Sequence, residues 1–457
     1  DPYLTMNFHA ERVIAEEFQK FLMNGTLYQG SKPVMWSPVE KTALAEAEIE
    51  YHDHKSHTIW VKFKPWMLVE HDNLDLTETE YLNSANIIIW TTTPWTIPSN
   101  KAVAFNPKID YGLYEVTGRP DECWAQIGER FVLADVLADD VMSKTRLEPS
   151  MYKRVRSVPT EHLQGIGLRH PFYGIDGANG YWDYDVPMID GDHVTDEAGT
   201  GFVHTAPSHG ADDYEAFMKR GWLDRMTHHV GEASEFLPHV PFFAGLEVFD
   251  RKGKEGKANA AVIAKLVEAG GIIARGQVKH SYPHSWRSKA PIIFRNTPQW
   301  FAAIDKTVGD GQDTYGTTIR ERALTSIDEL VTWTPQKGRN RLFAMIEQRP
   351  DWVLSRQRAW GVPLTCFTKV GALPTDDDFL LRNAEVNARI TTAFEEEGAD
   401  AWYQDGAKER FLSGLVDVDA YAQVMDILDV WFDSGSTHAF TLRDRADGSE
   451  DGLADLY

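Results

Sequence analysis

The chain has 457 residues, of which 42% are hydrophobic and 25% charged, a composition typical of a globular protein of about two to four domains. No stretch approaches the roughly 18 uninterrupted apolar residues of a transmembrane helix, so we expect no membrane partner. The net charge of −23 argues against a general nucleic-acid binder, although large RNA-handling enzymes can concentrate Lys and Arg where phosphates bind.

The cysteines and the chain ends indicate the context of the protein. Only Cys123 and Cys366 are present, which excludes a disulfide framework and predicts the reducing cytoplasm as the location. The sequence begins at Asp1 rather than at Met, and it ends at Tyr457 without a polar tail. We therefore expect an internal fragment of a larger protein.

Apolar residues recur at four-residue spacing near the start of the chain, which predicts a helix. They are Ile14, Phe18 and Leu22. Thr5 and Asn7 are candidate N-caps, and Gly25 is a suitable stop. Residues 51–57 then contain three histidines, which suggests a metal site, but their alternation with Asp and Lys favours a solvated loop or the edge of a strand.

Residues 58–275 contain short β-branched or aromatic runs bounded by Pro, Gly or Asn, which predict strands. The clearest runs are 87–90, 102–105, 111–116 and 186–189. Two helices are predicted among them, one beginning near Asp212 and one over residues 259–268 that stops at Gly270 and Gly271. This pattern indicates a mixed, barrel-like insertion rather than a doubly wound sheet.

Beyond Gln277 the chain is rich in Trp, Arg and Pro. The acidic stretch over residues 376–419 is predicted to be polar and loop-like with one helical patch. Residues 429–436 predict a strand followed by a tight turn.

The first candidate site is the run Thr91-Thr92-Thr93-Pro94-Trp95-Thr96, which continues to Asn100. It follows an apolar run, so it is predicted at the carboxyl end of a strand or in the loop beyond. Its hydroxyls and backbone N–H groups can hold a water and a carbonyl oxygen together. The alternative is a threonine-rich strand with an ordinary proline turn.

The second candidate site runs from Gly199 to Tyr214 and contains His204, His209 and Asp213. Asp212 and Asp213 open a predicted helix, where the helix dipole favours carboxylates. An Asp in such a site can bind a substrate ammonium, and a His can act as a base or as a pocket wall. Two alternatives stay open: simple helix capping with a surface His, or a metal-dependent hydrolase with His204, His209 and Asp213 as ligands.

Together these strings resemble the class I isoleucyl-tRNA synthetases of bacterial type, over nearly the whole chain. The Thr-Thr-Thr-Pro-Trp-Thr run and the Gly-Thr-Gly-x-Val-His-Thr-Ala-Pro run, followed by Asp-Asp-Tyr, match the two signatures of the inserted editing domain. Residues 42–48 resemble the segment before that insertion. Residues 355–361 and 429–436 resemble the second half of the catalytic domain.

The resemblance implies an α/β fold with an incomplete, split Rossmann-like catalytic domain and an inserted mixed β-barrel-like editing domain. The implied limits are 1–57 for the end of the first catalytic half and a connective segment, 58–275 for the editing domain, and 276–457 for the second catalytic half. Valyl and leucyl relatives carry Thr-Thr-Arg-Pro with an acidic residue soon after. Thr93 and Trp95 stand at those places, which favours the isoleucyl member over the valyl or leucyl type.

By this resemblance the pocket hydrolyses valyl-tRNA made in error. One methylene discriminates isoleucine from valine by only about 1–3 kcal/mol, a magnitude known from this same family, so a second sieve is needed. Asp213 is expected to bind the ammonium, while Trp95 and His204 exclude isoleucine. The four threonines are expected to hold the terminal adenosine, the ester carbonyl and the attacking water, with Thr92 and Thr93 catalytic beside Asp213. These are Thr91, Thr92, Thr93 and Thr96, with Asn100 as a further candidate. No general base is evident, so positioning and oxyanion stabilisation are expected to carry the rate.

Trp431 resembles part of the pocket for the isoleucine side chain in the synthetic domain. Arg356 and Trp360 are expected to support that domain, and buried aromatic packing beside an Arg is the alternative for these residues. The implied partners are the tRNA for isoleucine, isoleucine itself and ATP with Mg²⁺, all bound by a complete enzyme that is expected to be a monomer.

Two departures from the family pattern are present. The cysteine pairs that often bind zinc near Trp36 and Trp286 are absent, so we expect no zinc. The ATP-binding His-Ile-Gly-His and Lys-Met-Ser-Lys-Ser strings are also absent. We expect them before Asp1 and after Tyr457, and therefore expect no activation of isoleucine by this chain alone. A non-catalytic RNA-binding remnant is a third possibility.

Overall fold

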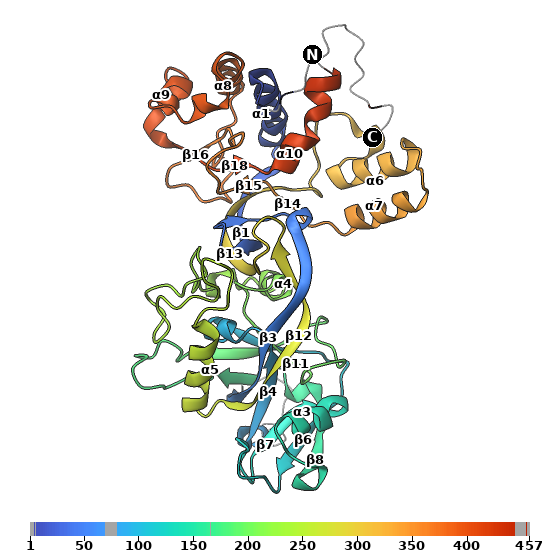
Figure 1. The fold of residues 1–457 in the computed structure, drawn as a ribbon, viewed down its shortest axis with the longest axis vertical. Helices are drawn as coiled ribbons and strands as arrows, with labels where there is room; N and C mark the ends of the chain where they lie inside the picture. The colour runs from blue at the N-terminus through green and yellow to red at the C-terminus, as the bar shows by residue number, and fades with distance from the viewer. Residues whose placement is uncertain (1–3, 5, 69–79, 165, 444–453, 455–457) are drawn as a thin grey trace. The chain divides into compact units, whose positions relative to one another are not determined.

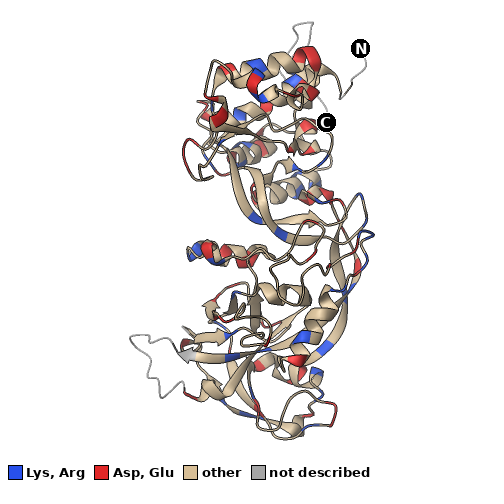
Figure 2. Ribbon diagram, turned by 90° about the vertical axis from the view of Figure 1, so that its left-hand side faces the viewer, with Lys and Arg blue, Asp and Glu red and all other residues tan. Residues whose placement is uncertain are grey.

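The computed structural model describes residues 4, 6–68, 80–164, 166–443 and 454. The chain divides into two compact units (Figure 1). Unit 1 contains residues 1–31, 42–45 and 297–457, and unit 2 contains residues 32–41 and 46–296. Figure 2 shows acidic and basic residues interspersed over both units. In the part of the chain that is described, no helix has both the length and the apolar character needed to span a membrane.

Unit 2 is built on a ten-stranded mixed sheet. Nine strands follow the order β11-β5-β10-β9-β3-β4-β7-β6-β8, and β12 pairs with β3. Their bounds are β3 Ile49–Leu68, β4 Ala85–Thr91, β5 Ala102–Phe105, β6 Tyr111–Val116, β7 Arg130–Ala134, β8 Tyr152–Val158, β9 Ile166–Arg169, β10 Asp185–Asp190, β11 Phe202–Thr205 and β12 Ile272–Ser285. The four strands predicted from β-branched runs are confirmed as β4, β5, β6 and β10.

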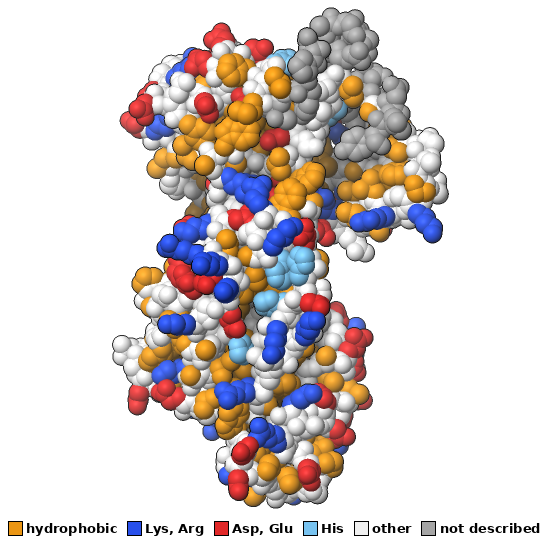
Figure 3. All heavy atoms as spheres, in the orientation of Figure 1, with side chains coloured by type: hydrophobic (Ala, Val, Ile, Leu, Met, Phe, Trp, Pro, Cys, Tyr) orange, Lys and Arg blue, Asp and Glu red, His pale blue; other side chains and the backbone are white. Residues whose placement is uncertain are grey.

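Strands β3 and β12 form a long antiparallel ribbon in which Ile49 faces Ser285 and Val61 faces Ile272. The three histidines of residues 51–57 lie in this ribbon, so the segment is a paired strand rather than a loop. His52 and His284 have ring centroids 5.1 Å apart, and Figure 3 shows histidine side chains gathered on the visible face. Among the described residues no group of three His, Cys, Asp or Glu side chains could hold a metal ion.

Unit 2 also contains three helices, of which α3 and α5 contact the sheet. They are α3 Ala138–Lys144, α4 Ala211–Lys219 and α5 Ala258–Glu268. One core cluster joins Trp60, Ile88, Phe131 and Val141 from β3, β4, β7 and α3. The helices predicted near Asp212 and over residues 259–268 are confirmed as α4 and α5. The fold is therefore a mixed α/β structure with a large sheet.

Unit 1 has a helical core around α1 Phe8–Met23 and α8 Ala384–Glu397. The Asn7 side chain caps α1 by accepting the N–H of His9, as predicted, whereas Thr5 lies outside the described residues. The one helical patch predicted in the acidic stretch 376–419 is present as α8, in which Ile390 and Phe394 recur on one face and are completely buried. The prediction missed a second helix, α9 Ala407–Leu412.

Unit 1 contains several two- or three-residue strands and parts of the longer strands β1 and β13, whose remaining residues are assigned to unit 2. One sheet has the order β14-β13-β1-β2, and two strand pairs are β15-β18 and β16-β17. The bounds are β1 Leu27–Ser37, β2 Thr42–Ala43, β13 Ile293–Ala302, β14 Trp352–Val353, β15 Ser355–Arg356, β16 Phe367–Lys369, β17 Tyr421–Gln423 and β18 Ile427–Leu428. The pairs β13-β14, β15-β18 and β16-β17 are antiparallel. A Rossmann-like parallel sheet therefore stays a prediction.

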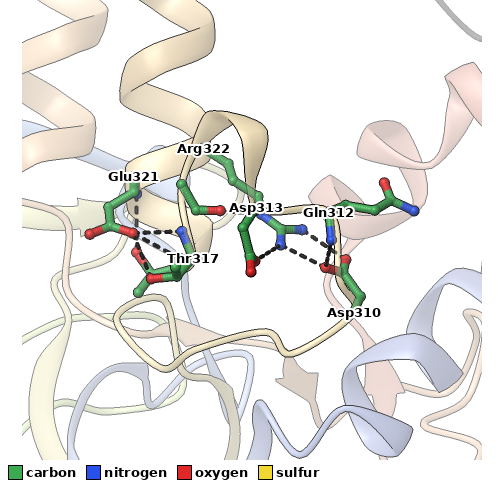
Figure 4. A network of polar contacts seen from close by, with 8 residues as sticks. Asp310, Gln312, Asp313, Thr317, Glu321 and Arg322 are labelled. Atoms are coloured by element: carbon green, nitrogen blue, oxygen red, sulfur yellow. Dashed lines mark hydrogen bonds and ion pairs between the residues drawn. The ribbon is translucent and has the colours of Figure 1, made fainter.

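A polar network closes the turn before helix α6 Ile319–Glu329, which α7 Lys337–Glu347 follows. Thr318 and Glu321 form a capping box, which satisfies backbone N–H groups at the helix start. Arg322 pairs with Asp310 at 2.7 Å and with Asp313 at 3.4 Å (Figure 4). The loop is thereby fixed to the first turn of α6.

The strand and tight turn predicted for residues 429–436 are wrong. Residues Val430–Gly435 form helix α10, because the carboxylate of Asp429 accepts the N–H of Trp431 at 3.1 Å and caps the helix start. The other carboxylate oxygen accepts the indole N–H of Trp352 at 2.9 Å and pairs with Arg356 at 2.9 Å. The Asp429 side chain is 0% exposed and that of Arg356 is 2% exposed.

We expect Asp429→Ala to destabilise unit 1 by about 3–5 kcal/mol, because it leaves the guanidinium of Arg356 buried without its counter-charge. The measurement is hydrogen–deuterium exchange of peptides that cover α10 and β15. The control is Glu397→Ala, which removes a 2.6 Å ion pair between Glu397 and Arg410, whose side chains are 37% and 40% exposed. Because this pair is solvated, its loss is expected to lower the stability by only about 0–1 kcal/mol. Equal, small effects of the two substitutions would contradict the prediction.

Candidate functional site

The threonine run lies at the end of a buried strand. Ile87, Ile88 and Ile89 of β4 are completely buried, which fixes the strand, and Thr91 is its last residue. Pro94 then opens a short 3-10 helix, η3 Pro94–Ser99. The predicted position at a strand end is therefore confirmed.

The hydroxyls of this run form one connected network. Thr91 Oγ1 accepts the N–H of Thr93 and lies 3.1 Å from Thr93 Oγ1. Thr93 Oγ1 lies 3.2 Å from Thr96 Oγ1, and the Thr96 hydroxyl donates to the carbonyl of Thr93 at 2.8 Å. Thr96 Oγ1 is also 2.8 Å from Nε2 of His204 in β11. The threonine run and the His204 segment, which are 108 residues apart at this contact, are thus joined by a hydrogen bond. The sequence analysis assigns both segments to one site, and such a site needs them to be in contact.

The neighbours of His204 fix its tautomer. The side-chain nitrogen of Asn100 donates to the carbonyl of Ala102 at 2.8 Å and lies 2.9 Å from Nδ1 of His204. An amide nitrogen can only donate, so Nδ1 accepts and the ring proton sits on Nε2, where it donates to Thr96. Burial lowers the pKa of His204 to about 3, and the charge of His209 acts in the same direction. His204 is therefore neutral, with both nitrogens engaged, and it does not serve as a free base.

Asp213 lies in the first turn of α4, and its carboxylate accepts the N–H of Ala206 at 2.8 Å. Burial raises its pKa to about 7, and the charge of Asp212 adds to that effect while the N–H of Ala206 opposes it. A Cβ on Gly210 would lie 2.8 Å from Asp213 Oδ2, so a side chain at that position would displace the carboxylate. The carboxylate is linked to the His204 segment through the backbone of Ala206, two residues further along.

Trp95 forms one wall of a narrow pocket beside the threonines. Its indole is 4% exposed, and its backbone N–H donates to Asn259 Oδ1 at 3.1 Å. The pocket measures about 20 Å³, enough for a single water. It is lined by His54, Lys55, Ser56, Thr92, Thr93, Trp95, Phe249, Glu255, Asn259 and Tyr282.

Several of these lining residues were not predicted from the sequence. Asn259 opens α5, and His54 and Tyr282 face the pocket from the β3–β12 ribbon. The histidines of residues 51–57 are the available signal in the sequence, and their segment is a largely solvated strand, one of the two predicted alternatives. Their contribution depends on strand pairing between residues that are distant in sequence.

The metal-ligand arrangement of His204, His209 and Asp213 is not formed. Both nitrogens of His204 are engaged, as described above. His209 Nδ1 lies 3.0 Å from the carbonyl of Phe294, and its Nε2 lies 3.3 Å from Ser99 Oγ. Asp213 binds a backbone N–H instead of sharing a centre with them. The described part of the chain offers no three-donor metal site, so a metal-dependent hydrolase is not favoured.

The two segments that lack zinc-binding cysteines are joined by hydrogen bonds. Glu40 Oε1 accepts the hydroxyl of Ser285 and, at 3.2 Å, the N–H of Ser288. A carboxylate with serine partners occupies the position where the family pattern suggested thiols. The absence of zinc stays a prediction.

The three residues predicted for the synthetic domain lie in unit 1. Arg356 is buried beside Asp429, as described above. Trp431 in α10 is 41% exposed and Trp360 is 56% exposed. The alternative of buried aromatic packing is therefore wrong for Trp360, whose ring faces outward.

Comparison with known proteins gives a consistent family. Residues 1–453 match the family model described as tRNA synthetases class I (I, L, M and V). The chain is 63% identical to the isoleucine–tRNA ligase of Ruegeria pomeroyi, and the match covers 100% of the chain and 46% of that protein. It is 51% identical to the isoleucine–tRNA ligase of Bradyrhizobium diazoefficiens, and that match covers 97% of the chain and 43% of the relative. It thus spans about half the length of these relatives. A solved structure, GlLeuRS-CP1, covers 48% of the chain at 13% identity with a TM-score of 0.35, too low to support a conclusion.

The family match covers both units and includes the threonine run, the His204 segment and α10. The chain belongs to the class I tRNA synthetases.

Proposed function

We propose that unit 2 hydrolyses the ester of valyl-tRNA that has been made in error on the tRNA for isoleucine. The observation that carries this proposal is the hydroxyl network from Thr91 to His204 beside a pocket of one-water size. The named relatives, which are isoleucine–tRNA ligases, support isoleucine over valine or leucine as the cognate amino acid.

In the proposed reaction, a water attacks the ester carbonyl, the acyl–oxygen bond breaks, and the ribose hydroxyl leaves with a proton. Thr92 and Thr93 hold the water and the carbonyl oxygen, and Thr91, Thr96 and the terminal adenosine complete the site. The neutral His204 orients Thr96 rather than removing a proton, and the completely buried Asn100 orients His204. Positioning and oxyanion stabilisation therefore supply the rate.

Selectivity is proposed to depend on the size of the pocket. Trp95 lines the pocket and is 4% exposed, whereas His204 is 8% exposed and lies behind the threonines, bonded to Thr96. Both are proposed to exclude isoleucine, since neither can yield space without moving its buried partners. Asp213 binds the ammonium of the aminoacyl group. Because that ammonium favours the ionised carboxylate, its binding lowers the raised pKa of Asp213.

The finer fold assignments belong to the same proposal. A hydrogen bond of 2.9 Å from the N–H of Ala134 to the carbonyl of Thr200 links the end of β7 to the start of β11 and supports barrel-like closure of unit 2. We keep residues 58–275 as the editing domain and the split Rossmann-like arrangement for the flanking segments. The ribbon continues beyond those limits, to Ile49 and Ser285, because its strands stay paired there.

For the whole protein we propose ligation of isoleucine to its tRNA with ATP and Mg²⁺, as a cytoplasmic monomer, with Trp431 near the isoleucine side chain. The sequence of this chain contains neither of the two ATP-binding strings of the class. The residues present therefore do not fit ATP, and no step is assigned to it here.

The proposal is tested by incubating the chain separately with valyl- and isoleucyl-tRNA of the isoleucine acceptor. We expect loss of the valyl ester and retention of the isoleucyl ester, with no change when a chelator is added. Loss of activity with the chelator would favour a metal-dependent hydrolase. Binding of tRNA with both esters intact would favour a non-catalytic RNA-binding role.

His204→Ala is expected to raise hydrolysis of isoleucyl-tRNA by about tenfold, because the space of the imidazole can then receive one more methylene. Initial rates on the two esters give the ratio. The matched control is His162→Ala, since His162 is also 8% exposed but contacts Tyr81 instead of the threonines. Continued rejection of the isoleucyl ester would contradict the role of His204 as a wall.

Asp213→Asn is expected to lower kcat/KM for valyl-tRNA by about 10- to 100-fold, the usual range for one charge-assisted hydrogen bond. Since the pKa of Asp213 is raised to about 7, the carboxylate is protonated below that pH. Activity of the unsubstituted chain should therefore rise from about pH 6 to about pH 8, after subtraction of spontaneous hydrolysis. The rise should be lost in Asp213→Asn and kept in the neighbouring Asp212→Asn.

A further inference from the structure

A second series of hydrogen-bonded side chains, separate from the threonine network, contacts Trp95 through His209. Tyr181 Oη lies 2.9 Å from His229 Nε2, and His229 Nδ1 lies 2.7 Å from Ser99 Oγ. Ser99 Oγ lies 3.3 Å from His209 Nε2, and His209 Nδ1 lies 3.0 Å from the carbonyl of Phe294. We call these four side chains, Tyr181, His229, Ser99 and His209, the relay.

The direction of every hydrogen bond in the relay follows from its fixed end. Burial lowers the pKa of His209 to about 4, so its ring carries one proton at neutral pH. The carbonyl of Phe294 can only accept, which places that proton on Nδ1 and leaves Nε2 to accept from the Ser99 hydroxyl. Ser99 has no second proton, so it accepts from Nδ1 of His229.

The far end of the relay obeys the same constraint. Burial also lowers the pKa of His229, so its one proton is on Nδ1 and its Nε2 must accept. Tyr181 is the donor there, and burial raises its pKa to about 12, which keeps the phenol protonated. The four side chains thus form all their hydrogen bonds only with this one assignment of donors and acceptors. Reversing any single hydrogen bond would leave two lone pairs facing each other elsewhere in the relay.

The relay ends on the pocket wall. The ring centroids of His209 and Trp95 are 4.8 Å apart with an interplanar angle of 71°, an edge-to-face contact. Ser99 and His229 are each 1% exposed. Because the relay fixes the rotation of the His209 ring, it also limits how far Trp95 can move away from the threonines.

We propose that Ser99, His229 and Tyr181 are positioning residues that hold His209 against Trp95 and thereby set the width of the pocket for the aminoacyl side chain. This inference rests on the proposed editing function, and it attributes the discrimination between valyl and isoleucyl esters to the width that the relay imposes. None of the three residues touches the ester. They act through His209 and Trp95, at a site formed by segments around residues 99, 181, 209 and 229.

The first experiment needs no substrate. Nitrogen NMR of the chain with ¹⁵N-labelled histidine, assigned with single His variants, reports which ring nitrogen carries the proton. We expect Nδ1–H at both His209 and His229, and we expect Ser99→Ala to shift both signals while that of His162 stays unchanged. An Nε2–H tautomer at either ring would overturn the relay.

The second experiment measures the ratio of kcat/KM for valyl-tRNA over isoleucyl-tRNA. Tyr181→Phe and Ser99→Ala should each lower this ratio by about tenfold, through faster hydrolysis of the isoleucyl ester. Since both act on one chain of bonds, the double variant should equal Ser99→Ala alone. Effects that multiply, or an unchanged ratio in either single variant, would refute the positioning role.

The matched control is Tyr152→Phe, which removes a hydroxyl that donates to Asp139 at 2.6 Å outside the relay and should leave the ratio unchanged. Thermal melting confirms that each variant is folded, and Tyr181→Phe decides the matter if Ser99→Ala does not fold. If the unsubstituted chain hydrolyses neither ester, the proposed function fails. The histidine tautomers then still decide whether the relay exists.

Discussion

The candidate site depends on the hydrogen bond between His204 Nε2 and Thr96 Oγ1, which is 2.8 Å long. It joins β11 to the helical turn that follows β4, and both partners are buried. A buried imidazole without partners would cost about 1–3 kcal/mol for each unsatisfied group, so the surrounding structure must supply an acceptor at Nε2 and a donor at Nδ1. Thr96 and Asn100 meet that demand, and the conformation of the whole threonine run follows from it.

Burial also shifts the ionisation of the titratable groups at the site. Burial lowers the pKa values of His204 and His209, and it raises that of Asp213. In the proposed reaction, a substrate ammonium would draw Asp213 further into the ionised form. Binding of the amino group and ionisation of Asp213 would then be coupled.

The two units use buried polar groups in different ways. In unit 1, Asp429 combines an ion pair to Arg356, a bond to Trp352 and a helix cap, so one carboxylate fixes β15, β14 and α10. In unit 2, neutral side chains form two series of hydrogen bonds in which each group donates to the next. One series leads from Asn100 to the carbonyl of Thr93, and the other leads from Tyr181 to the carbonyl of Phe294. The first arrangement provides stability, whereas the second fixes the orientation of rings that pack behind the residues lining the pocket.

The sequence by itself determined the elements whose pattern is local. The apolar run 87–90, the glycine stop after α5 and the Asn7 cap each satisfy a rule that needs only neighbouring residues, and the structure follows them. It also indicated the family, because the threonine run and the His204 segment are specific strings. It missed the second helix of residues 376–419, α9, and it failed at 429–436, where a side-chain cap overrode a strand-like pattern.

Only the tertiary structure decided which polar groups meet. His54 and Tyr282 line the pocket because β3 and β12 pair with each other. Ser99 meets His229, which is 130 residues away in the sequence, and His229 meets Tyr181, which is 48 residues away. The tautomers of His204 and His209, and hence their chemistry, follow from those partners rather than from the residue type. Burial and hydrogen-bond direction are properties of the assembled core, and no local pattern in the sequence carries them.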